Sequence, residues 1–386
     1  MRIYSQADEE KIRAQSLVRE WHRSGFIDAS QLAQLLSELQ VGLRRTNLFL
    51  RSVLFLFTWV VIAAAVSLVV TIAAVNTDAF NGIICLVAAV GCSAIAQFVI
   101  RHFRFYRFGV EEAFATAGPV LLSIGVTLLA PRGGDYQFAA GLAAGALGFV
   151  AVFVRYRYVY AAVAGLICAA AVPIPLVHNV VTMRVLAAVV CAFTFLVVRK
   201  GRLFFVDDFP GDDYGVIQAS AFVGIYLALN LQLASSSYYQ EDLLYWATYG
   251  LTWILPIIGF WLALPTKDRP LMNVSVVSGL ITLVTNKSYL HLMRQPWDPI
   301  LFGALLIGSA ILTKRWLAKG TDGQRRGFTT VRLLASDRQA MTVLSTVSAA
   351  LQSPGPSPST PSGPARTAEP NFGGGRSGGA GASGSF

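Results

Sequence analysis

Residues 52–75 read SVLFLFTWVVIAAAVSLVVTIAAV, an unbroken run without a charged side chain. A helix needs about 20 apolar residues to cross the hydrocarbon core of a bilayer, so this run is long enough to span it. The rest of the chain has the same character, because apolar residues make up 54% of it and charged residues only 13%. A soluble domain carries about 25% charged residues. The composition therefore excludes an ordinary soluble enzyme and a disordered chain, and it predicts a membrane protein.

Nine further apolar runs follow, and together they predict an all-α fold, a polytopic bundle of ten transmembrane helices. The predicted spans are 52–75, 81–100, 112–130, 138–154, 158–177, 179–198, 215–234, 243–265, 271–289 and 299–317. The first span lies too far along the chain for a cleaved secretory signal, so we expect it to direct insertion itself. The predicted domains are a hairpin leader 1–51, a transmembrane domain 52–317, an amphipathic segment 318–352 and a disordered tail 353–386.

The distribution of Lys and Arg predicts the orientation of these spans. With a cytoplasmic N-terminus, 27 of the 31 basic residues fall on the cytoplasmic side, and only Arg132, Arg184, Lys287 and Arg294 fall on the other. Cytoplasmic loops of membrane proteins carry the excess of basic residues, so both termini are predicted to be cytoplasmic. This topology accounts for the net charge of +10, and no nucleic-acid partner is expected. Arginines alternate with aromatics in 101–107 and 155–158, which predicts interfacial anchors, with a specific lipid site as the alternative.

The leader is predicted to form a hairpin of two short helices within residues 6–40. Gly25 stands where the first helix would end, and Asp28 precedes Gln31 by three residues, which is the spacing of a capping box. Apolar stripes run along both helices, formed by Ile12, Leu17, Val18 and Trp21 and then by Leu32, Leu35, Leu36 and Leu39. A hairpin this small cannot hold a core of its own, so we expect it to pack on a partner, a second copy or the membrane face.

Two sequence phrases resemble a bacterial family of predicted membrane proteins, the family with domain of unknown function 2157. The first is WHRSGFIDASQ at 21–31, followed by a Leu-rich helix, and the second is FYRFGVEEA at 105–113. The resemblance covers the hairpin and the first three predicted spans. It implies a multi-pass protein of the bacterial inner membrane and assigns no activity.

Two weak internal similarities suggest different repeats. Residues 108–113 resemble 214–219, and both open predicted spans, which fits a tandem repeat of four spans. Pro119 and Pro256 are instead predicted to interrupt the third and eighth spans, which fits two inverted halves of five spans. Broken helices in such inverted repeats often mark a transport site. The sequence leaves both alternatives open.

The chain lacks the usual signatures of an enzyme. GxSxG, HExxH and Walker A motifs are absent, and the four His residues have no ligand spacing. All four Cys residues lie inside apolar runs, where they are expected to pack as small apolar side chains. The acidic loop 207–213 offers oxygen ligands but has no known cation-site spacing, so a solvated turn is favoured. The sequence predicts no enzyme, no metal site and no cofactor.

One cluster of polar residues within the predicted spans is a candidate ligand site. The spans are almost free of acids, with Glu112 at an inner edge as the exception. The candidate residues near the outer ends are Arg184, Lys287, Asn230 and Gln232, together with the helix face Ser275, Ser278, Thr282, Thr285 and Tyr289. They are predicted to line an outward-facing pocket for an anionic or polar ligand. The alternative is that the two cations reach the interface and the polar face packs between helices.

The C-terminal tail is predicted to be disordered and to carry a docking element. Pro, Gly and Ser make up 22 of the 34 residues in 353–386, too many for a packed core. Ser336 with Gln339 fits the start of a short amphipathic helix before the tail. Phe372 and Phe386 are candidate docking residues for a cytoplasmic partner, because an aromatic ring on a flexible tether can fill a pocket.

The sequence favours a non-enzymatic inner-membrane protein, a scaffold, sensor or assembly factor with cytoplasmic docking segments at both ends. The alternative is a transporter or flippase for a polar or anionic ligand that uses the polar cluster. The expected partners are the lipid bilayer and a cytoplasmic protein, and the oligomeric state is not predicted.

Overall fold

A computed structural model describes most of the chain up to Thr329. The described residues are 3–73, 77–131, 134–204, 213–233, 243–266, 268–290, 297–319, 324–325 and 328–329. Helices dominate this part of the chain, and its only strands are the two-residue pair β1 (Gln324–Arg325) and β2 (Phe328–Thr329). The prediction of an all-α fold is therefore confirmed. The chain forms two compact units, unit 1 (Met1–Gln6, Gly42–Ala263 and Pro270–Met293) and unit 2 (Ala7–Val41, Leu264–Arg269 and Arg294–Phe386).

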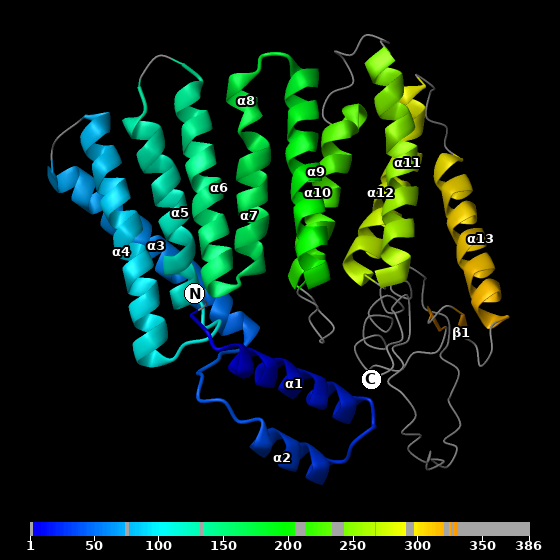
Figure 1. The fold of residues 1–386 in the computed structure, drawn as a ribbon, viewed down its shortest axis with the longest axis horizontal. Helices are drawn as coiled ribbons and strands as arrows, with labels where there is room; N and C mark the ends of the chain where they lie inside the picture. Colours follow the sequence, from blue (N-terminus) through cyan, green and yellow to red (C-terminus); the bar gives the residue numbers. More distant parts are fainter. Residues whose placement is uncertain are drawn as a thin grey trace, which may run out of the picture. The chain divides into compact units, whose positions relative to one another are not determined.

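Unit 1 is a bundle of long helices that run up and down beside one another (Figure 1). The helices are α3 (Leu48–Ala73), α4 (Asp78–Phe103), α5 (Val110–Leu129), α6 (Tyr136–Tyr156), α7 (Val159–Ala171), α8 (Pro173–Leu176), α9 (Val180–Phe204), α10 (Asp213–Leu229), the 3-10 turn η1 (Leu231–Leu233), α11 (Leu243–Thr266) and α12 (Arg269–Tyr289). Neighbours in sequence pack together, α4 on α5, α5 on α6, α6 on α7, and α9 on α10. In addition, α3 contacts α5, and α7 contacts both α9 and α10.

Seven helical segments of the described residues are long and apolar enough to cross a membrane, namely α3, α4, α5, α6, the α7–α8 pair, α9 and α11. These segments support a polytopic helical membrane protein. Each of the ten predicted runs overlaps one helix or, for 158–177, the α7–α8 pair. Three of these helices are not among the seven: α10, which is apolar but has 17 residues, α12, and α13 (Asp298–Ala318) of unit 2. The number of spans therefore stays a prediction.

The predicted helix breaks at Pro119 and Pro256 are wrong. Helix α5 runs continuously through Pro119, and α11 runs continuously through Pro256. One proline removes a single backbone hydrogen bond, and neighbouring helices tolerate this in a membrane bundle. The break lies instead between α7 and α8, where Pro173 begins the short second helix. The inverted repeat thereby loses the feature that suggested it.

The arrangement of helices favours the tandem repeat. Residues 108–113 lead into α5, and 214–219 lie at the start of α10. Gly118 and Gly224 stand at equivalent positions after these two segments. Gly118 of α5 packs against α4, and Gly224 of α10 packs against α9. The partners also correspond, because α3 lies beside α4 and α5 as α7 lies beside α9 and α10.

The hairpin of unit 2 has the predicted caps. Helix α1 (Gln6–Arg23) ends at Gly25, whose φ of +78° suits glycine, and the amides of Gly25 and Phe26 donate to the carbonyls of His22 and Trp21 at 3.0 and 2.9 Å. Helix α2 (Ala29–Glu38) begins with the capping box. There the Asp28 carboxylate accepts from the Gln31 amide at 2.7 Å, and the Gln31 side chain accepts from the Asp28 amide at 3.0 Å.

Replacing Asp28 by Ala is expected to increase amide hydrogen exchange in the first turn of α2, because that turn loses its side-chain acceptor. The Gln31 amide lowers the pKa of the Asp28 carboxyl below its usual value. The carboxylate therefore stabilises α2 above the ordinary Asp pKa, and this contribution is lost as the pH falls through the lowered value. Exchange measured on the full chain at several pH values checks both points. An unchanged first turn in the variant would contradict the capping argument.

Several predictions fall on residues outside the described part of the chain. They are the amphipathic helix after Ser336, the acidic loop 207–212, the disordered tail 353–386 and the docking residues Phe372 and Phe386.

Candidate functional site

The polar face predicted on residues 271–289 is buried in unit 1. Ser275, Ser278, Thr282, Thr285 and Tyr289 of α12 are between 1% and 6% exposed. Asn230, just after α10, is fully buried, and Arg184 of α9 is 9% exposed. The structure thus brings residues of α9, α10 and α12 together. Gln232 and Lys287 are half-buried.

Asn230 is the centre of a hydrogen-bonded network in this polar cluster. Its amide nitrogen donates to the Tyr226 hydroxyl at 3.1 Å and to the Thr285 hydroxyl at 3.2 Å. The Tyr226 hydroxyl also contacts the Thr282 hydroxyl at 2.8 Å. The Arg184 guanidinium donates to the backbone carbonyl of Asn230 at 3.2 Å. These bonds join three helices through side chains whose hydrogen-bonding groups are largely satisfied by one another.

The end of the same cluster holds the turn after α10 in place. The Tyr289 hydroxyl accepts from the Leu231 amide at 2.7 Å, and the Tyr245 hydroxyl donates to the Tyr289 carbonyl at 2.8 Å. Gln232 donates to the Tyr245 hydroxyl at 3.0 Å. Helix packing alone therefore explains most of the burial of these polar groups, and the predicted pocket is not needed to explain it.

A second polar site lies where α3, α5 and α7 begin. Glu111 and Glu112 stand in the first turn of α5 and are 0% and 2% exposed. Gly109 precedes them with a φ of +108°, and a Cβ at this position would collide with the carbonyl oxygen of Arg51. The glycine thus lets the start of α5 approach α3 closely. Two adjacent carboxyls buried at one helix end require partners or protons.

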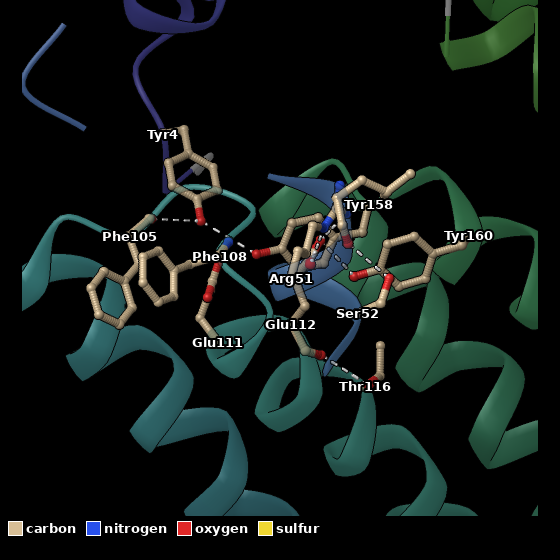
Figure 2. Close-up of polar contacts among 11 residues, drawn as sticks. Tyr4, Arg51, Ser52, Phe105, Phe108, Glu111, Glu112, Thr116, Tyr158 and Tyr160 are labelled. Atoms are coloured by element: carbon tan, nitrogen blue, oxygen red, sulfur yellow. Dashed lines mark hydrogen bonds and ion pairs between the residues drawn. The ribbon is translucent and has the colours of Figure 1, made fainter. Parts of the chain in front are cut away.

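Glu112 has a complete set of partners from two other helices (Figure 2). Arg51 of α3 donates through Nε to one carboxylate oxygen at 2.6 Å and through Nη2 to the other at 2.5 Å. The Tyr160 hydroxyl of α7 donates to the same carboxylate at 3.2 Å. A bidentate arginine–carboxylate pair is among the strongest hydrogen-bonded contacts in proteins. This pair therefore ties together the ends of α3, α5 and α7.

Glu111 is satisfied on one side only. Its Oε1 accepts from the Phe108 amide at 2.6 Å, and the start of α5 favours negative charge there. Its Oε2 is buried and has no hydrogen-bond partner within the described residues. The two neighbouring acids therefore differ. Glu112 pairs with the guanidinium of Arg51, whereas the hydrogen bond described for the Glu111 side chain comes from a backbone amide.

The N-terminal segment covers this site with a tyrosine ring. The Ile3 amide donates to the Arg155 carbonyl at 3.1 Å, and the Tyr4 hydroxyl donates to the Phe105 carbonyl at 3.2 Å. The same hydroxyl contacts that of Tyr158 at 3.3 Å, as Figure 2 shows. Tyr4 is 6% exposed, and burial raises the pKa of its hydroxyl, which stays neutral.

The chain that leaves this point through Tyr4 returns to the same loop after the hairpin. The Arg44 amide donates to the Arg104 carbonyl at 2.9 Å, and the Tyr106 amide donates to the Arg44 carbonyl at 3.0 Å. Tyr4 and Arg44 flank the hairpin helices in the sequence, and both bind the loop between α4 and α5. We call these two attachments the hairpin anchors.

Sequence reasoning singled out Glu112 at this site and missed its partners. The sequence places Arg51 among the basic residues of the leader, and its contact with Glu112 joins positions 61 residues apart, which no local pattern reveals. The adjacent acids at the start of an apolar helix were the one available signal. Tyr4 and Tyr160 carry no signal of their own in the sequence.

Comparisons with known proteins add no relative. No family model matches the chain, and no curated protein or solved structure matches it either. The resemblance to the family with domain of unknown function 2157 therefore stays a prediction. Among the described residues, no three His, Cys, Asp or Glu side chains gather as a metal site would require.

Proposed function

We propose that this chain is a multi-pass protein of the bacterial inner membrane with ten spans and both termini in the cytoplasm. In this proposal it is not an enzyme, and it acts as a scaffold or sensor whose cytoplasmic hairpin binds a protein partner. The observation that supports the proposal is the pair of hairpin anchors, which hold the chain just before and just after the hairpin to one loop of the bundle.

The grouping of the helix ends supports the proposed orientation. The pairing of Arg51 with Glu112 and Tyr160 joins the starts of α3, α5 and α7, and Arg157 donates to the Tyr214 hydroxyl at 2.7 Å near the start of α10. The arginine-rich loops after α4 and α6 lie at this same end. Since basic loops of membrane proteins remain in the cytoplasm, this end and the hairpin are assigned to the cytoplasm.

The hairpin has the features of a docking segment. It is made of two short amphipathic helices, its leucines on α2 are only half-buried, and Phe26 at its turn is 43% exposed. A pair of helices of this size gains stability by covering its apolar stripe with a partner. Because both ends are anchored, a partner that moves the hairpin also pulls on the loop between α4 and α5.

Replacing Tyr4 by Ala is expected to release the first anchor and to raise hydrogen exchange in residues 104–109 and at the start of α1. The matched variant, Tyr4→Phe, keeps the ring against Tyr106, whose centroid lies 5.0 Å away, and loses only the hydroxyl bonds, so it should show a smaller increase. Exchange on the full chain in lipid nanodiscs measures both. A photo-crosslinker at Phe26, in cells, should give one discrete protein adduct that weakens in Tyr4→Ala.

Two results would contradict the proposal. Equal exchange in Tyr4→Ala and the unchanged protein would show that the anchor does not couple the hairpin to the bundle. Labelling of Ser24→Cys by a membrane-impermeant reagent in intact cells, in a chain whose four native cysteines are replaced, would place the hairpin on the wrong side of the membrane.

A further inference from the structure

An open groove of about 610 Å³ runs along α4 toward its C-terminal end. Val90, Ala94 and Phe98 form its apolar part, and Gln97, Arg101 and His102 form its polar end. Val90 is 71% and Phe98 is 60% exposed, so this apolar face is not covered by the described part of the protein. The opposite face of α4, with Cys85, Ala89, Cys92 and Ala96, is buried. The groove thus lies on the outer side of the bundle.

The polar end of the groove is positively charged. Arg101 and His102 occupy the last turn of α4, and His102 stacks on Phe98 with ring centroids 5.3 Å apart. Arg155 of α6 donates to Gln97 at 2.7 Å, so a second guanidinium contacts one of the lining residues without lining the groove itself. The lining residues include no acid. An anion that entered this end would meet the guanidinium of Arg101, and the charge of Arg155 beside Gln97 would add to the attraction.

The length of the groove matches one leaflet of a bilayer. Val90 and Arg101 are separated by about 16 Å along the helix axis at 1.5 Å per residue. Half of a hydrocarbon core of about 30 Å is nearly the same distance. An apolar stripe of this length that ends in cations has the pattern of a phospholipid, with an acyl chain along one part and a phosphate at the other.

We propose that this groove binds an anionic phospholipid, with its phosphate at Arg101 and an acyl chain along Val90, Ala94 and Phe98. A free phosphate would use the cationic end alone and leave the apolar stripe without a role. The inference rests on the proposed membrane location, because the exposed face of α4 then meets lipid.

The test compares Arg101→Gln with Lys200→Gln, which removes a cation near the end of α9, outside the groove. The unchanged chain and both variants are placed in nanodiscs of phosphatidylcholine with increasing phosphatidylglycerol, and retained lipid is counted by native mass spectrometry. Retention of phosphatidylglycerol is expected to weaken about five-fold in Arg101→Gln, as for the loss of one surface cation. Lys200→Gln should keep the retention of the unchanged protein. Inorganic phosphate added in excess should not displace the lipid.

Three outcomes would overturn the inference. Equal retention of phosphatidylcholine and phosphatidylglycerol would show that the groove does not recognise the headgroup. Equal losses of phosphatidylglycerol retention in both variants would indicate nonspecific attraction to basic residues. Displacement by inorganic phosphate would indicate a phosphate site in place of a lipid site. Vesicle flotation separates these results from failure of the proposed function. A chain that floats with vesicles but shows no preference refutes the groove alone, and a chain that does not float refutes the membrane location as well.

Discussion

Replacing Glu112 by Gln is expected to destabilise the folded protein by about 3 kcal/mol, because Arg51 then keeps a partly buried charge without its counter-ion. The Arg51 side chain is 25% exposed, so some water contact remains and the loss stays at the lower end for broken buried pairs. The amide of Gln cannot accept both guanidinium bonds, and its own N–H faces Arg51. Thermal unfolding in a fixed detergent measures the effect.

The neighbouring acid offers a matched control. Glu111→Gln changes a carboxyl one position earlier, but its remaining oxygen still accepts from the Phe108 amide, and the oxygen without a partner is the one replaced. We expect this variant to lower the free energy of unfolding by about 1 kcal/mol or less, because it breaks no ion pair. The double variant Arg51→Met with Glu112→Gln should recover part of the loss, since neither charge is then left alone. Equal losses in Glu111→Gln and Glu112→Gln would contradict the assigned role of the ion pair.

The helices and the hairpin caps could be predicted because they depend on neighbours in sequence. The apolar run 52–75 specifies a helix by length and composition alone, and α3 covers most of it. Asp28 and Gln31 are three residues apart, and Gly25 supplies the positive φ that ends α1, so both caps follow from local geometry. The polar spacing along α12 likewise revealed one face, since polar groups on an apolar helix turn away from lipid.

The partners across helices could not be predicted from such patterns. Nothing in the sequence distinguishes Arg51 from the other basic residues of the leader. Its role depends on the close approach at Gly109, which brings α3 beside Glu112. Tyr226, which bonds Asn230 and Thr282, lies within an apolar run and gives no polar signal. At Pro119 a local pattern gave a wrong prediction. Proline favours a helix break, but α5 continues through it because the helix is held by its packing in the bundle.

Replacing Asn230 by Leu is expected to lower the free energy of unfolding by about 3 kcal/mol. The same variant tests whether the polar cluster packs helices or binds a ligand. The change removes the donor to the Tyr226 and Thr285 hydroxyls and leaves both in a site that is closed to water. Tyr226 keeps its contact with Thr282 and Thr285 keeps its bond to the Ile281 carbonyl, but each hydroxyl loses the bond that it accepts, in a place where water cannot replace it.

Asn286→Leu makes the same chemical change at a half-buried residue and serves as the control. It removes one hydrogen bond, which the Tyr249 hydroxyl donates at 2.7 Å. We expect it to lower the free energy of unfolding by about 1 kcal/mol. The measurement is thermal unfolding with and without inorganic phosphate as an anionic probe. If the cluster serves helix packing, phosphate leaves the unfolding temperature of the unchanged protein where it was, and Asn230→Leu lowers it in both buffers. If phosphate stabilises the unchanged protein and not Asn230→Leu, the cluster binds an anion, and the transporter alternative replaces the scaffold. Equal losses in the two Asn variants would instead show that the buried bonds of Asn230 contribute no more than the half-buried bond between Tyr249 and Asn286.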